Sequence, residues 1–115
     1  MYQYIIAKYF KKQLKPYAKK FPGIFLDVIR ELTYFNKARS VRLGGNLYKL
    51  RLSVTQLKKG KSKSFRLIIY LIENDSLIIP VTIFIKSEKG NMKTKEIKYH
   101  VDNLNNDLKN NDYFL

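Results

Sequence analysis

The residues best suited to chemistry are four cations on three predicted strands. Lys49 and Arg51 lie two residues apart in an alternating segment, so a strand projects both from the same side. Arg66 lies in the next such segment, and Lys86 ends the one after it. If hairpin pairing aligns the strands, these cations form one cluster that binds and polarises phosphate groups. A merely solvated sheet face is the alternative interpretation of the same spacing.

Apolar and aromatic side chains share the predicted cationic face. They are Ile68, Tyr70 and Phe84. Aromatic rings set among cations suit stacked bases and their phosphates, so Tyr70 and Phe84 are predicted RNA-binding residues.

A basic loop is predicted at residues 57–64, with Lys59, Lys61 and Lys63 as candidate contacts to a nucleic-acid backbone. A Gly-Lys-Ser run within it is similar to part of a nucleotide-binding phosphate loop. The first glycine of that motif would fall at Thr55, however, and no helix follows, so we reject a nucleoside triphosphate site. A hairpin tip without a binding role is the alternative.

The net charge predicts a polyanionic or acidic partner. The 115-residue chain carries a formal charge of +14, and residues 32–71 hold ten lysines and arginines without one acid. A surface that repels itself this strongly lowers stability unless an anionic partner meets it, and nucleic acid is the commonest such partner.

Other kinds of site receive little support from the composition. The chain has no cysteine, and His100 is the only histidine, which leaves it a minor candidate for a general acid. The carboxylates are scattered and form no metal-binding motif, so we expect neither metal nor cofactor. Because no apolar stretch approaches about 18 residues, we also expect no membrane partner and a cytoplasmic location.

Hydrophobic periodicity gives the elements that must position these residues. They are a strand at residues 2–6, a helix from residue 8 with a kink or break at Pro16, a helix from residue 24, strands at residues 47–53, 65–72 and 77–86, and a helix from residue 94. In the last strand, Ile79, Val81, Ile83 and Ile85 are expected to face the core. The order β-α-α-β-β-β-α predicts one α+β domain over residues 1–115, with a small, mainly antiparallel sheet backed by helices and the cations on the opposite face.

Several segments, in this order and spacing, are similar to those of one toxin superfamily. They are Phe10–Lys15, Leu47–Leu52, Lys59–Ser62 followed by Phe65–Tyr70, and Thr82–Lys89. Together they resemble the RelE/ParE toxins, specifically the RelE/HigB-type mRNA interferases. The resemblance implies a RelE-like fold and the toxin of a type II toxin–antitoxin system. Such toxins enter the ribosomal A site and cut the mRNA there.

The resemblance also implies roles for individual residues. Lys49 and Arg51 match a basic pair, Arg66 matches an arginine that contacts phosphate, and Lys86 and Lys89 match a basic cluster after the last strand. Within that cluster, a serine stands where the RelE pattern has arginine, and the tyrosine that follows in that pattern is missing.

RNA cleavage through the RNA's own 2′-hydroxyl requires an aligned nucleophile, a stabilised phosphorane and a protonated leaving oxygen. Arg51 and Arg66 supply fixed donors to the phosphate oxygens, and Lys49 is the better candidate for proton transfer because arginine almost never loses its proton. A ribosome that aligns the RNA in advance would help a site with few acid or base groups. An acidic antitoxin is the expected protein partner. The alternative is a binder without catalysis, either a ParE-like inhibitor of DNA gyrase or an RNA-binding module.

Overall fold

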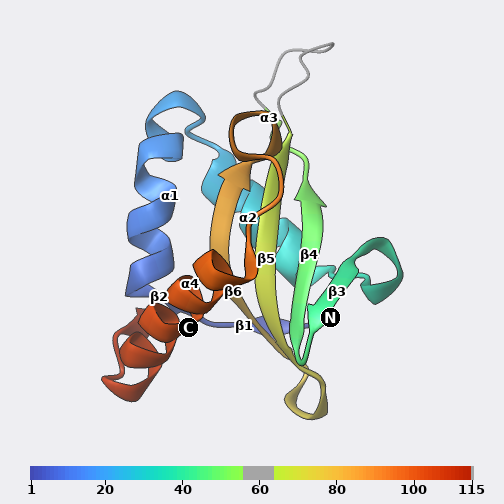
Figure 1. Ribbon diagram of the computed structural model, residues 1–115, viewed down its shortest axis with the longest axis vertical. Coiled ribbons are helices and arrows are strands. Elements are labelled where there is room, and N and C mark those ends of the chain that lie inside the picture. The colour runs from blue at the N-terminus through green and yellow to red at the C-terminus, as the bar shows by residue number, and fades with distance from the viewer. Residues whose placement is uncertain (56–63, 115) are drawn as a thin grey trace.

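The main sheet is mostly antiparallel. The structure, a computed structural model, describes residues 1–55 and 64–114 (Figure 1). Within those residues, five strands pair in the order β1-β6-β5-β4-β3. Their bounds are Gln3–Tyr4 for β1, Val41–Gly44 for β3, Leu47–Leu52 for β4, Phe65–Ile72 for β5 and Leu77–Ile85 for β6. Only the β1–β6 pair is parallel among these described strands, so the predicted α+β class is confirmed.

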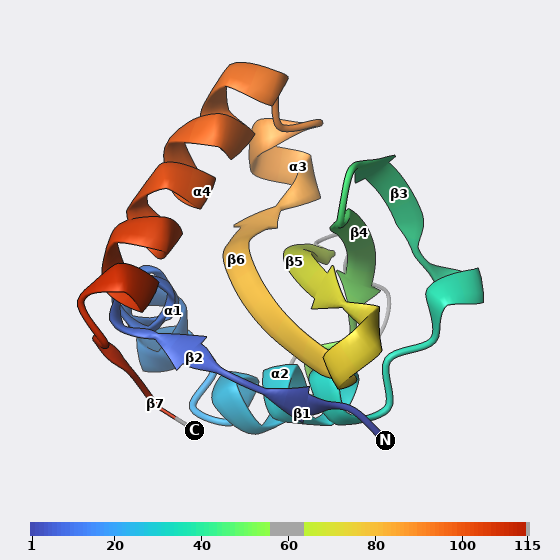
Figure 2. The ribbon, with the colours of Figure 1, turned by 90° about the horizontal axis from the view of Figure 1, so that it is seen from below.

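Helices cover both faces of this sheet, as Figure 2 shows. Helices α1 (Lys8–Lys20) and α2 (Ile24–Thr33) pack on one face, and α4 (Thr94–Lys109) packs on the other. The sequence pattern placed the cations on a face free of helices, but α4 covers part of that face. Its apolar residues, with Leu104 fully buried, pack against β5 and β6.

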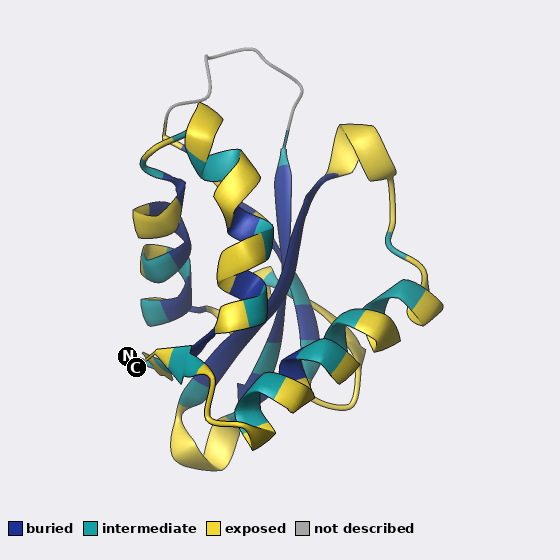
Figure 3. Ribbon diagram, turned by 90° about the vertical axis from the view of Figure 1, so that its left-hand side faces the viewer, coloured by how far each residue is buried: buried dark blue, intermediate teal, exposed yellow. Residues whose placement is uncertain are grey.

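Strand β5 shows the alternation that the sequence predicts. Phe65, Leu67 and Ile69 belong to the core beneath α1 and α2, whereas Ile68 belongs to the smaller core beneath α4. Because successive side chains of a strand point to opposite faces, one apolar strand serves both cores. Figure 3 shows the resulting buried centre and the exposed outer surfaces of the helices.

Strand β6 departs from the predicted alternation. Ile83 packs in the core beneath α1 and α2, but Ile79 and Val81 pack in the core beneath α4. The reason is a register shift: Ile68 pairs with Thr82 and Ile69 with Pro80, which leaves Val81 as an extra, bulged residue. A bulge exchanges the two faces of a strand, and it also accommodates a proline that lacks a backbone donor.

Helix α1 continues through Pro16, where the sequence predicted a kink or break. Pro16 and Lys12, the residue whose carbonyl loses its helical donor, are both exposed, so water can satisfy that carbonyl. The helix buries Phe10 and Leu14 and presents lysines outward, as its period requires.

The remaining elements are short. The predicted first strand is divided, because β1 joins the main sheet and β2 (Ile6–Ala7) pairs with β7 (Tyr113–Phe114). Strand β3 was not predicted, and neither was α3 (Lys86–Lys89), which begins at the residue expected to end a strand. Single 3₁₀ turns, η1 and η2, lie at Lys37–Arg39 and Glu73–Asp75. No helix in the described part of the chain is long and apolar enough to cross a membrane.

Candidate nucleic-acid interface

The strand register places three of the predicted cations on one sheet face. Arg51 of β4 pairs directly with Arg66 of β5, and Lys49 pairs with Ile68. Directly opposed residues of antiparallel strands project from the same face, so Lys49, Arg51 and Arg66 all lie on the α4 side of the sheet. We call these three residues, together with Lys86, the cation row.

Arg66 is the most buried member of the cation row, with 9% of its surface exposed. Its Nη1 donates to Ser64 Oγ at 2.9 Å and to the carbonyl oxygen of Phe65 at 3.3 Å. Burial and, secondly, the charge of Arg51 lower the pKa of Arg66. Nε and Nη2 bond to no described residue. Within the described part of the chain, these donors are therefore left for an anion.

No carboxylate neutralises the cation row within residues 1–55 and 64–114. The ion pairs of this region use Arg30, Lys37, Lys89 and Lys98 as their cations. Like charges directly opposed across two strands repel, and a desolvated guanidinium adds to that cost. A bound phosphate group would remove both penalties.

Lys49 is held by the segment that connects α3 to α4. Its Nζ donates to Asn91 Oδ1 at 3.3 Å, although the two residues are 42 positions apart in sequence. The connection runs across the α4 side of the sheet in Figure 1. Gly90 allows the backbone to turn from α3 into this connection, because its φ of 74° lies in the region that favours glycine. Asn91 was not among the predicted site residues, and no local pattern in the sequence marks it.

Lys86 lies at the end of the cation row. Its backbone N–H donates to the carbonyl oxygen of Ser64 at 2.9 Å, two residues from Arg66. The side chain of Lys86 is exposed on α3. Lys89, at the other end of α3, instead forms an ion pair with Glu96 Oε2 at 2.6 Å, so its charge is already partly neutralised.

The predicted aromatic contacts are less accessible than expected. Phe84 is only 4% exposed and packs in the core beneath α4, which corrects its predicted position on an open binding surface. Tyr70 is half-buried against the same core. The remaining RNA-binding candidates, Lys59, Lys61 and Lys63, lie outside the described residues.

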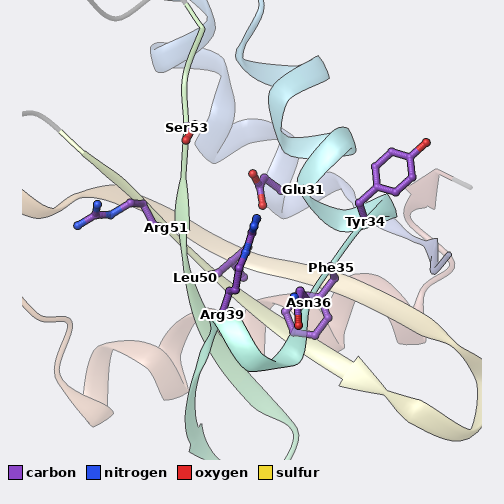
Figure 4. Close-up of a pocket in the computed structure, with 8 residues that line it drawn as sticks. All are labelled: Glu31, Tyr34, Phe35, Asn36, Arg39, Leu50, Arg51 and Ser53. Atoms are coloured by element: carbon purple, nitrogen blue, oxygen red, sulfur yellow. The ribbon is translucent and has the colours of Figure 1, made fainter. Parts of the chain in front are cut away.

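A polar cavity of about 360 Å³ lies on the other side of β4, next to the end of α2 (Figure 4). Glu31 and Arg39 point toward each other across it, while the Arg51 side chain points away. Burial raises the pKa of Glu31, and the charges of Arg39 and Arg30 partly oppose that shift. Arg51 also lines this cavity, so the cavity adjoins the cation row at β4.

Of the comparisons with known proteins, only the structural comparison supports the fold. No protein-family model matches the sequence, and no curated protein matches it either. Among solved structures, the chain is similar to the toxin RelE of E. coli, in a free-state double mutant with two arginines replaced by alanine. The TM-score is 0.52 at 13% identity, covering 86% of this chain and 92% of RelE. This chain has the RelE fold.

The RelE fold was predicted from the sequence, and the comparison confirms it at that level. It does not test the roles assigned to the cation row, which remain predictions. The structure adds two facts about this site. Lys49, Arg51 and Arg66 lie on one face of the sheet, and Asn91 accepts a hydrogen bond from Lys49.

Proposed function

We propose that this protein is a toxin that cuts mRNA on the ribosome, with the cation row as its catalytic surface. The observation that carries the proposal is Arg66, a buried residue whose Nε and Nη2 bond to no described residue, beside Arg51 and without a carboxylate partner among the described residues. A guanidinium in this setting is suited to a phosphate group, because it offers two parallel donors next to a second cation.

The proposed reaction uses the RNA's own 2′-hydroxyl as the nucleophile. The 2′-oxygen loses its proton and bonds to the adjacent phosphorus while the 5′-oxygen leaves and gains a proton. The products are a 2′,3′-cyclic phosphate and a free 5′-hydroxyl. Arg51 and Arg66 stabilise the charge on the phosphorane oxygens. Lys49 Nζ accepts the proton of the 2′-hydroxyl and passes it to the leaving 5′-oxygen, so that it ends the reaction in the form in which it began. Asn91 sets the position of Lys49 before RNA arrives.

The surroundings of the cation row favour RNA that is positioned by another particle. Phe84 is buried and α4 covers part of the sheet face, so little aromatic surface is left to hold a free strand. The ribosome would supply that alignment in its A site and so reduce the entropy cost of reaching the reactive geometry. The protein would act in the cytoplasm, and an acidic antitoxin would neutralise its charge of +14.

Primer extension tests this function. The purified protein is incubated with ribosomes carrying an mRNA whose A site is vacant, and the same mRNA without ribosomes serves as the control. We expect new 5′ ends within the A-site codon only when ribosomes are present. Absence of cleavage together with RNA binding would favour an RNA-binding module, and inhibition of gyrase supercoiling would favour a ParE-like binder. Either result would overturn the proposal.

A further inference from the structure

The polar cavity beside the end of α2 contains an acidic and a basic side chain that face each other without contact. Glu31, from α2, and Arg39, from η1, point toward each other across it (Figure 4). Neither side chain forms an ion pair or a hydrogen bond with a described residue. The cavity therefore presents a carboxylate acceptor and a guanidinium donor to a ligand that enters between them.

Glu31 is an unusual residue in this basic part of the chain. Residues 1–72 contain only one other acid, Asp27. Asp27 is buried and accepts hydrogen bonds from Arg30 and Thr55, so it has a structural use. The carboxylate of Glu31 is half-buried and has no such partner among the described residues. Because partial burial of an unpaired charge costs free energy, a ligand that brings donors to Glu31 best explains its position.

Local hydrogen bonds fix the turn that carries Arg39. Asn36 Oδ1 accepts from the Ala38 N–H at 3.0 Å, and the Arg39 N–H donates to the carbonyl oxygen of Asn36, also at 3.0 Å. Lys37, in the same turn, forms an ion pair with Glu73 at 2.7 Å. The turn is therefore preformed and presents Arg39 to the cavity without rearrangement.

Guanine matches these two groups better than the other bases do. Its N1–H and N2 amine are adjacent donors that a carboxylate accepts together, and its O6 and N7 are acceptors that a guanidinium binds. Adenine and cytosine each present an amine beside a ring acceptor, which would face the carboxylate unfavourably. Tyr34 also lines the cavity, and its ring, in a residue 68% exposed, stacks on no described ring. It is therefore accessible to a base.

We propose that this cavity binds a guanine base, with Glu31 on the N1–H and the N2 amine and Arg39 on O6 and N7. Because Arg51 also lines the cavity, the phosphate of a bound guanosine would lie next to the cation row. The base belongs either to an RNA strand or to a free guanine nucleotide. The inference rests on the proposed function only in so far as that RNA is the mRNA that is cut.

Fluorescence anisotropy with labelled oligonucleotides of about five nucleotides tests the inference. The probes have 2′-O-methyl riboses, which cannot react through a 2′-hydroxyl, and uridines surround one central base. That base is guanine, adenine, cytosine or uracil. Two further probes carry inosine, which lacks the N2 amine, or 7-deazaguanosine, which lacks N7. Unlabelled GMP and the unlabelled guanosine oligonucleotide are the competitors.

Glu31→Gln and Arg39→Gln test the two contacts separately. The matched controls are Asp112→Asn and Lys109→Gln, which make the same changes of charge at exposed positions that do not line the cavity. Since the side chains of Glu31 and Arg39 have no partner among the described residues, both variants should keep the far-UV circular dichroism spectrum of the parent protein. The inosine and 7-deazaguanosine probes test the same contacts in the unaltered protein.

We expect the guanosine probe to bind the parent protein about tenfold more tightly than the adenosine, cytidine and uridine probes. Inosine should weaken binding to the parent but not to Glu31→Gln, and 7-deazaguanosine should weaken binding to the parent but not to Arg39→Gln. The control variants should keep the preference of the parent. Displacement by GMP as effective as that by the guanosine oligonucleotide would identify a free nucleotide as the ligand, and much weaker displacement by GMP would identify an RNA strand. Both results support the site.

Two results would overturn the inference. The guanosine and adenosine probes could bind the parent equally well, or a preference for guanosine could remain in both Glu31→Gln and Arg39→Gln. Primer extension on ribosomes keeps this test distinct from that of the proposed function. Cleavage by the parent together with equal binding of all probes would refute the guanine site alone. Guanosine-specific binding without any cleavage would refute the proposed function alone.

Discussion

Replacing Arg51 by glutamine should make the protein more stable and less active at the same time. Arg51 and Arg66 are paired residues on adjacent antiparallel strands, and like charges in that position destabilise a sheet by about 0.2–1 kcal/mol. Arg51 is exposed, so its replacement opens no cavity. The free energy of unfolding should therefore rise by about that amount, which corresponds to an increase in Tm of about 1–4 °C.

A double-mutant cycle isolates the repulsion. Urea unfolding is measured for the parent, Arg51→Gln, Arg66→Gln and the double variant, at about 0.1 M and about 1 M salt. The gain from Arg51→Gln should disappear in the Arg66→Gln background, because the repelling partner is then gone, and it should shrink at high salt. Cleavage on ribosomes should fall about 10²–10³-fold in Arg51→Gln.

A different outcome of the cycle would refute this reasoning. If Arg51→Gln lowered the free energy of unfolding, or if the coupling between the two sites were zero at low salt, the two guanidinium groups would not be unneutralised neighbours. The case for an anion site between them would then lose its physical basis.

Three further predictions concern packing and protonation. Phe84→Ala should lower the free energy of unfolding by about 3–5 kcal/mol in urea titrations, because Phe84 is a core residue; a loss under about 1 kcal/mol would contradict its burial. Asp27→Ala should lower the free energy of unfolding by about 1–3 kcal/mol, because it removes the acceptor of the Thr55 N–H and hydroxyl. Asp27→Asn keeps an acceptor oxygen and should lower that free energy less. Equal losses in the two variants would contradict this reasoning. Burial lowers the pKa of His100, whose Nδ1 lies 2.6 Å from the Tyr9 hydroxyl oxygen, so the neutral ring is favoured on folding. The free energy of unfolding should therefore be constant with respect to His100 above its unfolded pKa of about 6.5 and should fall as pH falls below that value. His100→Gln should flatten the plot of unfolding free energy against pH in this range. An unchanged slope would exclude His100 as the source of the pH dependence.

The sequence predicts the fold well where the spacing of apolar residues within a single strand or helix shows which of its faces is buried. The alternation of Phe65, Leu67 and Ile69 with Ile68 follows from a period of two that any pairing preserves. The shared face of Lys49 and Arg51 follows from the same rule. Helix α1 likewise shows its buried face through the spacing of apolar residues.

The features that the sequence does not predict depend on contacts between distant segments. Strand β6 is apolar at most positions, so Pro80 is the one sign of the bulge in its pattern, and the place of the bulge at Val81 depends on the register with β5. The burial of Phe84 depends on where α4 crosses the sheet. The contact of Lys49 with Asn91 joins residues 42 positions apart.

The most direct test of the central claim is the single-turnover rate of mRNA cleavage on programmed ribosomes for Arg66→Ala and Arg42→Ala. Arg42 pairs with Tyr48, which belongs to the core beneath α1 and α2, so Arg42 projects from the face opposite the cation row. Arg42→Ala therefore removes the same charge as Arg66→Ala without changing the cation row. The account predicts that Arg66→Ala cleaves about 10²–10³-fold more slowly and that Arg42→Ala matches the parent. Equal rates for the parent and Arg66→Ala would contradict it.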